Sequence, residues 1–189
     1  MSQQIFTIGH STHPIEEFVG ILAAHGVEHL VDVRTIAKSR HNPQFGEEQL
    51  RASLAESAIR YDRLEALGGL RRTVKDSPNG AWKKASFRGY ADYMQTPEFA
   101  VGLDRLIEYG AHATVAIMCA EAVPWRCHRS LIGDALLVRG IGVVDIMGEK
   151  SLREHALTRF ARVDGTDVTY PREDAATQEP GDTQPRTGV

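Results

Sequence analysis

The chain has 189 residues, of which 42% are hydrophobic and 25% are charged, and its formal net charge is −3 at pH 7. This composition is that of a globular protein and excludes wholesale disorder, and the length fits one domain better than two. The longest apolar runs are far shorter than the roughly 20 residues of a membrane-spanning helix, and the N-terminus lacks the charged and apolar regions of a signal peptide. We therefore expect a cytoplasmic protein with no membrane partner.

The first part of the chain predicts a β-α-β unit. A short β-branched run at 5–8 indicates a strand, and a helix with Pro14 in its first turn and Gly26 at its end follows it. A second apolar run at 30–33 indicates the next strand. Because only a helix separates the two strands, we expect them to be parallel.

The remainder of the chain continues to alternate strands with helices. The pattern predicts a long loop at 34–46, a helix at 47–58, a strand from 59, an irregular segment at 68–85, helices near 87–94 and 97–109, a strand at 114–118, a helix at 127–139, a strand at 143–147 and a last helix at 152–160. This order predicts an α/β protein, a three-layer fold with a mostly parallel central sheet and long basic loops. We expect one domain over residues 1–171 and a disordered polar tail at 172–189.

Positive charge is concentrated in the middle of the sequence. Residues 34–90 contain twelve Lys or Arg against six Asp or Glu, whereas the segments on both sides are acidic. Such an excess favours an anionic partner, either a small molecule or a nucleic acid. The alternative is an ordinary solvated surface, because an excess in sequence need not form one patch in space.

Candidate site residues follow the predicted strands. In an open parallel sheet, ligands bind beyond the carboxyl ends of the strands. His10 and Ser11 follow the first strand and Arg34 the second, whose end contains Asp32; Glu121 comes just after the strand at 114–118. Ser11 and the following helix start are typical of an anion site, although a turn with a helix cap has the same pattern.

The segment from Cys119 to Arg129 permits three interpretations of its two cysteines, Cys119 and Cys127. In the first, one thiol is a nucleophile with Glu121 or His128 as its acid/base partner, since a helix start and nearby arginines favour a thiolate. In the second, both thiols and His128 bind a metal together with His10, although adjacent ligands on a helix point in different directions. In the third, the thiols are small buried apolar groups.

Two basic loops combine arginine with aromatic side chains. Ser39 and Arg40 precede Phe45, and Arg88 lies between Phe87 and Tyr90. Arginine contacts with phosphate and stacking of rings on bases are typical of nucleic-acid binding. The alternative is that these aromatic side chains belong to the core.

Six segments, in this order, together resemble the bacterial family called domain of unknown function 488. They are Thr7–Thr12, Asp32–Arg34, Ser39–Phe45, Leu67–Gly69, Phe87–Met94 and Cys119–Arg129. The resemblance extends over nearly all of residues 5–171. It implies that these segments form one site, and it implies no particular activity, cofactor or oligomeric state.

We therefore expect an enzyme, a hydrolase or transferase, that acts on a phosphorylated, nucleotide-like or nucleic-acid substrate at the strand ends. The expected catalytic residues are His10, Glu121, Cys119 and His128, and no metal is expected. The expected substrate-binding residues are Ser11, Asp32, Arg34, Ser39, Arg40, Arg88 and Arg129. The alternative function is a non-catalytic nucleic-acid-binding module that uses the basic central loops.

Overall fold

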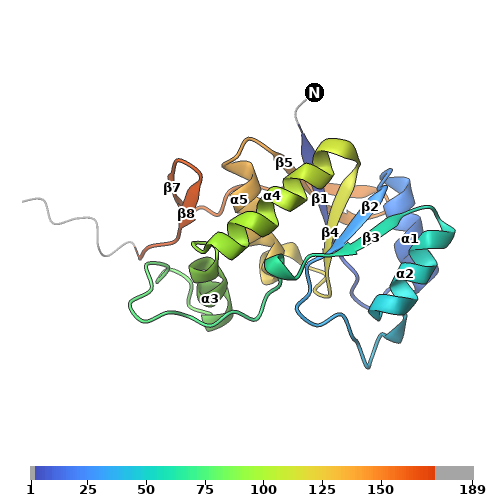
Figure 1. The fold of residues 1–189 in the computed structure, drawn as a ribbon, viewed down its shortest axis with the longest axis horizontal. Coiled ribbons are helices and arrows are strands. Elements are labelled where there is room, and N and C mark those ends of the chain that lie inside the picture. Colours follow the sequence, from blue (N-terminus) through green and yellow to red (C-terminus); the bar gives the residue numbers. More distant parts are fainter. Residues whose placement is uncertain (1–2, 173–189) are drawn as a thin grey trace, which may run out of the picture.

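The computed structural model describes residues 3–172, so the predicted tail lies outside the described residues except for Arg172. Its centre is a six-stranded sheet with the order β3-β2-β4-β1-β5-β6 (Figure 1). The strands are β1 (Gln4–Gly9), β2 (His29–Asp32), β3 (Arg60–Arg63), β4 (Val115–Cys119), β5 (Gly142–Gly148) and β6 (Ser151–Glu154). All neighbouring strands are parallel except β5 and β6, which are antiparallel. The predicted α/β class with a mostly parallel sheet is confirmed.

Helices cover both faces of the sheet. The helices α1 (Ile15–Ala24) and α2 (Glu47–Glu56) pack on one face, and α3 (Ala85–Tyr93), α4 (Pro97–His112) and α5 (Arg129–Leu137) pack on the other (Figure 1). None of these five helices is both long and apolar enough to cross a bilayer.

The two faces of β4 show how the sequence assigns side chains to the two layers. Ala116 and Met118 belong to the core under α1 and α2, whereas Val115, Ile117 and Cys119 belong to the core under α3–α5. This is the period of two expected for a strand that is buried on both faces. It places the Cys119 side chain on the α5 face.

The direction of the connections changes at β4. The chain passes from β4 to α5 on one face, whereas the strands on either side, β1 and β2, are followed by α1 and α2 on the other face. Neighbouring connections that leave to opposite faces open a crevice at the carboxyl ends of the strands. The fold therefore places a crevice beside Cys119.

Two predicted elements were wrong in type or extent. The segment predicted as a helix at 152–160 instead begins in the edge strand β6, because a short turn after Gly148 returns the chain antiparallel to β5, and residues 155–160 form neither helix nor strand. The helix predicted to end before Gly110 continues to His112. Gly110 lies inside α4, at a position where a side chain would collide with Gln3 and Ile5. The absence of a side chain therefore lets the helix pack closely on β1.

A further hairpin was not predicted. Strands β7 (Arg162–Asp164) and β8 (Asp167–Thr169) form a separate two-stranded antiparallel sheet, and Gly165 has a φ of 60° in the turn between them. Glycine adopts this left-handed conformation without a steric penalty. The hairpin brings Tyr170 into the core formed with α5.

The close approach of β1 to the loop after β4 can be tested at Gly9. A Cβ at this position would lie 2.0 Å from the Glu121 carbonyl oxygen and 2.7 Å from Ala122 Cα, both of them backbone atoms. We expect Gly9→Ala to lower the free energy of unfolding in urea by about 1 to 3 kcal/mol, because overpacking against backbone forces the chain to move.

The matched control is Gly20→Ala in α1, where a Cβ meets nothing within 4 Å. This change should raise the free energy of unfolding by about 0.5 to 1 kcal/mol, since alanine favours a helix over glycine. If Gly9→Ala were as stable as the wild type, the loop would not be packed on β1.

Candidate functional site

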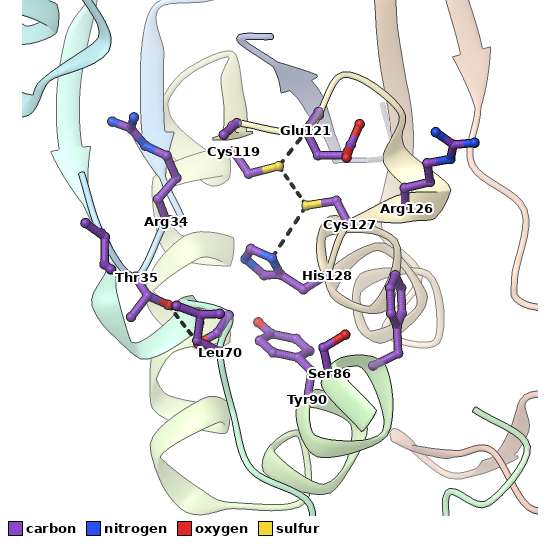
Figure 2. Close-up of a pocket in the computed structure, with 14 residues that line it drawn as sticks. Arg34, Thr35, Leu70, Ser86, Tyr90, Cys119, Glu121, Arg126, Cys127 and His128 are labelled. Atoms are coloured by element: carbon purple, nitrogen blue, oxygen red, sulfur yellow. Dashed lines mark hydrogen bonds between the residues drawn. The ribbon is translucent and has the colours of Figure 1, made fainter. Parts of the chain in front are cut away.

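Two hollows meet at the carboxyl end of β4. The first, which we call the thiol pocket, has a volume of about 330 Å³ and is lined by Cys119, Cys127 and His128 together with side chains of α3 (Figure 2). The second, which we call the histidine pocket, has a volume of about 440 Å³ and is lined by His10 and Ser11 among others. The two pockets share Arg34, Ile36, Ala120 and Glu121, so one ligand could occupy both.

Backbone hydrogen bonds hold the two pockets together. Beyond the last residues of β1 and β4, the His10 N–H donates to the Cys119 carbonyl at 2.9 Å, and the Ser11 N–H donates to the Ala120 carbonyl at 3.0 Å. Ser11 has a φ of 47°, which turns the chain away from the sheet at this point. The segment that follows β1 and the segment that follows β4, both predicted to contain site residues, therefore lie side by side.

The two cysteines of the chain form a thiol pair on the α5 side of the site. Their Sγ atoms lie 2.7 Å apart, and both side chains are free thiols that are buried, with 3% of Cys119 and 7% of Cys127 exposed. Cys119 ends β4, and Cys127 precedes α5 by two residues. Figure 2 shows the pair at one wall of the thiol pocket, with His128 next to it.

The guanidinium of Arg129 fixes this pair. Only 1% of Arg129 is exposed, and its Nε donates to Cys119 Sγ at 3.0 Å. Its Nη1 donates to Thr7 Oγ1 on β1 at 3.0 Å, and its Nη2 donates to the Glu121 carbonyl. One buried cation therefore joins β1, the end of β4 and the loop that leads to α5.

The surroundings of the pair favour a thiolate on Cys127. The hydrogen bond from Cys119, together with the charge and hydrogen bonds of Arg129, lowers the pKa of Cys127 to about 6 against the opposing effect of burial. Burial raises the pKa of Cys119, which therefore keeps its proton and donates it. The position of Cys127 just before α5 acts in the same direction, because a helix start stabilises negative charge.

His128 faces the same sulfur as a neutral imidazole. Its Nε2 lies 2.8 Å from the Val33 carbonyl, which can only accept, so Nε2 carries the hydrogen and Nδ1 has a free lone pair. This Nδ1 lies 3.5 Å from Cys127 Sγ. Burial lowers the pKa of His128, so near neutral pH the ring can accept a proton but does not hold a positive charge.

A buried polar network extends from Arg129 to the far side of the site. Thr7 Oγ1 donates to Asp145 at 2.6 Å, and His155 lies between Asp145 and Asp134, 3.0 Å from the latter. Tyr170 donates to the other oxygen of Asp134 at 2.8 Å. The positive charge of Arg129 is thus balanced by carboxylates that the sequence places after the site segments.

The histidine pocket is organised around a second buried arginine, Arg34. Its Nε and Nη2 donate to the fully buried Asp32, and the Tyr61 hydroxyl donates to the same carboxylate at 2.7 Å. Its Nη1 lies 3.4 Å from His10 Nε2. Asp32 therefore holds Arg34 through contacts within the protein, and its role in substrate binding stays a prediction.

His10 is placed to support Arg34. The ring stacks on Phe45 with centroids 4.1 Å apart, and its Nδ1 lies 2.8 Å from the Ser11 carbonyl, so Nε2 is the acceptor that faces Arg34. Burial lowers the pKa of His10 to about 4. Its catalytic role stays a prediction, since the nitrogen that would take a proton faces a guanidinium.

The mouth of the site contains exposed groups of both charges. Glu121 and Arg126 are exposed and line the thiol pocket, and Glu121 lines the histidine pocket as well. Apolar side chains accompany them: Ile36 is 61% exposed and Leu70 is 75% exposed. The rim is therefore apolar with a few charges, as expected for a ligand pocket.

The remaining predicted residues divide into two groups. Ser11 and Ser39 line the histidine pocket, although the Ser39 hydroxyl also accepts from the Asn42 N–H at 2.9 Å. Arg40 is exposed and Arg88 half-buried, and neither lines either pocket. Arg129 lies behind the thiols and contacts Cys119, and its role in substrate binding stays a prediction.

Sequence reasoning missed the lining residues Arg126, Ile36 and Leu70, and it named the aromatic pair Phe87 and Tyr90 only as possible partners of a nucleic acid or as core residues. Arg126 could have been identified as a lining residue from its position next to Cys127 in the sequence. The aromatic pair could have been found from its helical spacing only if the face of α3 toward the site had been known. Within residues 3–172, no group of three or more His, Cys, Asp or Glu is arranged to hold a metal ion.

A family model described as Domain of unknown function DUF488 matches residues 14–136, which is well over half of the chain. The chain belongs to this family. No curated protein and no solved structure matches the chain. The DUF488 match includes Arg34 and all of Cys119–Arg129, whereas His10 and Ser11 precede it and the carboxylate of Asp145 follows it. The thiol pocket thus lies mainly within the family segment.

The polar network behind Arg129 can be tested by replacing His155. Burial alone lowers the pKa of His155, but hydrogen bonds with Asp134 and Asp145 outweigh this effect and raise it from 6.5 to about 9. The imidazolium therefore stabilises the fold fully below pH 6.5, and this contribution is lost as the pH rises through 9. We expect the difference in free energy of unfolding between wild type and His155→Gln to shrink by about 2 to 3 kcal/mol from pH 6 to pH 9.

Comparing the two proteins removes the opposing contribution of Cys127, which both contain. His41→Gln, a change on an exposed loop, is the matched control and should leave the free energy of unfolding unchanged at every pH. A difference between wild type and His155→Gln that stayed constant from pH 6 to 9 would show that His155 is not charged between the two carboxylates.

Proposed function

We propose that this DUF488 protein is an enzyme, a transferase or hydrolase, that binds a phosphorylated or nucleotide-like substrate and attacks it with the Cys127 thiolate. One observation supports this most directly. The Cys127 sulfur lines the thiol pocket 2.7 Å from Cys119 Sγ, with the buried guanidinium of Arg129 behind the pair. A thiolate stabilised in this way is a strong nucleophile at neutral pH, unlike an inert buried cysteine.

The surrounding groups have distinct roles in this proposal. Cys119 and Arg129 position and stabilise the attacking sulfur, and they touch no substrate. Glu121 is exposed at the junction of the two pockets, where its carboxyl group can exchange a proton with a leaving group. His128 offers Nδ1 as an acceptor for the Cys127 proton when the thiol is not ionised.

The shape and polarity of the pockets support the substrate class. Phe87 and Tyr90 line the thiol pocket with Ile36 and Leu70, which suits a flat apolar ring. Arg126 lies at the same pocket and Lys38 at the histidine pocket, and both can bind phosphate oxygens. A nucleotide-like molecule could therefore place its ring in one pocket and its phosphate toward the other.

The nucleic-acid-binding alternative depends on the basic middle of the chain. Part of this charge is used within the protein: Arg60 pairs with Asp62 at 2.8 Å, and Arg63 pairs with Glu65 at 2.9 Å. Such pairing weakens the positive field that would attract a polyanion. The enzyme proposal therefore has the stronger support.

Selective alkylation tests the proposal, because the chain contains only two cysteines. Iodoacetate is anionic and iodoacetamide is neutral. If the pocket binds anions, the ratio of the alkylation rate with iodoacetate to that with iodoacetamide should be higher at Cys127 than at the thiol of free glutathione. We expect saturating nucleoside monophosphate or sugar phosphate to slow carboxymethylation of Cys127 at least tenfold, measured by peptide mass spectrometry.

Arg126→Gln should lower the iodoacetate preference and weaken this protection. The matched control is Lys83→Gln, an exposed basic residue of the same region that lines neither pocket, and it should change nothing. The proposal fails if no phosphorylated compound slows the reaction and Arg126→Gln leaves the rate ratio unchanged. Protection by single-stranded DNA alone, lost steeply with added salt, would support the nucleic-acid alternative instead.

A further inference from the structure

We infer that Cys119 and Cys127 are a two-electron redox couple that reduces the disulfide of a small molecule bound in the thiol pocket. This activity goes beyond the proposed transferase or hydrolase function and shares with it only the Cys127 nucleophile. It assigns a chemical task to Cys119, whose thiol lies beside the nucleophile and has no attacking role in the proposed function.

The distance between the sulfurs permits a bond. They lie 2.7 Å apart, and a disulfide of about 2.05 Å requires them to approach by roughly 0.7 Å. Cys119 is at the end of a strand, whereas Cys127 follows the short 3-10 turn Pro124–Arg126 and precedes α5. A movement of this size can be absorbed by the loop between the two residues without a change in the sheet.

The charge beside the pair argues against inert packing. A buried guanidinium donates more favourably to a sulfur that shares negative charge than to a neutral apolar group, because hydrogen bonds to ionised acceptors are the stronger ones. Arg129 makes this contact with Cys119 at 3.0 Å, next to Cys127. The guanidinium therefore favours negative charge shared by the two sulfurs, and a thiolate is the form that attacks a disulfide.

The reaction balances with a disulfide as the oxidant. The Cys127 thiolate attacks one sulfur of the substrate, the substrate S–S bond breaks, and the first thiolate leaves with the electron pair and takes a proton from water. Cys119 then loses its proton and attacks Cys127 Sγ, which releases the second substrate thiolate, and that thiolate is protonated. The protein is oxidised to the Cys119–Cys127 disulfide, and the substrate is reduced to two thiols.

The burial of the pair restricts the substrate to a small molecule. Both sulfurs are less than a tenth exposed and are reached through a pocket of about 330 Å³, so a disulfide within a folded protein could not approach them. Arg126 at this pocket suits a carboxylate, and the apolar rim suits a short carbon chain. A disulfide of a small thiol that bears carboxylates, such as oxidised glutathione, fits these features.

Equilibration with glutathione tests the inference. The full-length wild type is incubated at a series of ratios of reduced to oxidised glutathione, quenched with acid, alkylated with N-ethylmaleimide and weighed by mass spectrometry. We expect a single transition from two alkylated thiols to none, without accumulation of a glutathione adduct, because Cys119 resolves the mixed disulfide.

The two single-cysteine variants should differ from each other. Cys119→Ser should stop at one glutathione bound to Cys127, whereas Cys127→Ser should remain a free thiol, since burial raises the pKa of Cys119. The inference is overturned if the wild type forms no intramolecular disulfide at any ratio, or if both cysteines form adducts independently.

The result also separates this inference from the proposed function. A wild type that never forms the disulfide, but in which iodoacetate still alkylates Cys127 rapidly, would remove the redox activity and leave the nucleophile in place. A Cys127 that reacts with neither reagent would remove both. The wild-type titration needs no substitution, so a variant that fails to fold does not affect the decision.

Discussion

A fully buried guanidinium, that of Arg129, joins β1, the end of β4 and the loop that leads into α5. A buried cation of this kind needs partners on every side, and here they are Cys119, Thr7 and a backbone carbonyl. Through Thr7 the same charge is linked to Asp145 and the imidazolium of His155. The interaction that fixes the loop therefore also acts with the Cys119 hydrogen bond to favour a thiolate on Cys127.

The topology of the sheet determines where the thiol pair meets a pocket. Because α5 leaves β4 toward one face while α1 and α2 follow the neighbouring strands on the other, the chain opens a crevice at the carboxyl end of β4. The thiol pocket lies on one side of that crevice and the histidine pocket on the other. Glu121 belongs to both pockets, which makes it the group best placed to act on a ligand that spans them.

Most of the fold could be predicted from the sequence, because apolar residues at periods of two and of about four identify strands and helices directly. The edge strand β6 was missed because its side chains are exposed and show no alternation of buried and exposed residues. Several side chains expected at the strand ends do line the two pockets, but the role of each depends on which side chains face each other. Nothing in the sequence shows that Arg129 points behind the thiols, or that Asp145 and His155, far along the chain, balance its charge.

We propose that Cys127 is a thiolate near neutral pH because Cys119 and Arg129 stabilise it. The most direct measurement is the ultraviolet absorbance of the thiolate as a function of pH. We expect an increase equivalent to one thiolate with a midpoint near pH 6 in the wild type, absent in Cys127→Ser and displaced to higher pH in Cys119→Ala. A wild type whose absorbance stayed constant until the pH approached the ordinary thiol pKa of about 8.5 would contradict it.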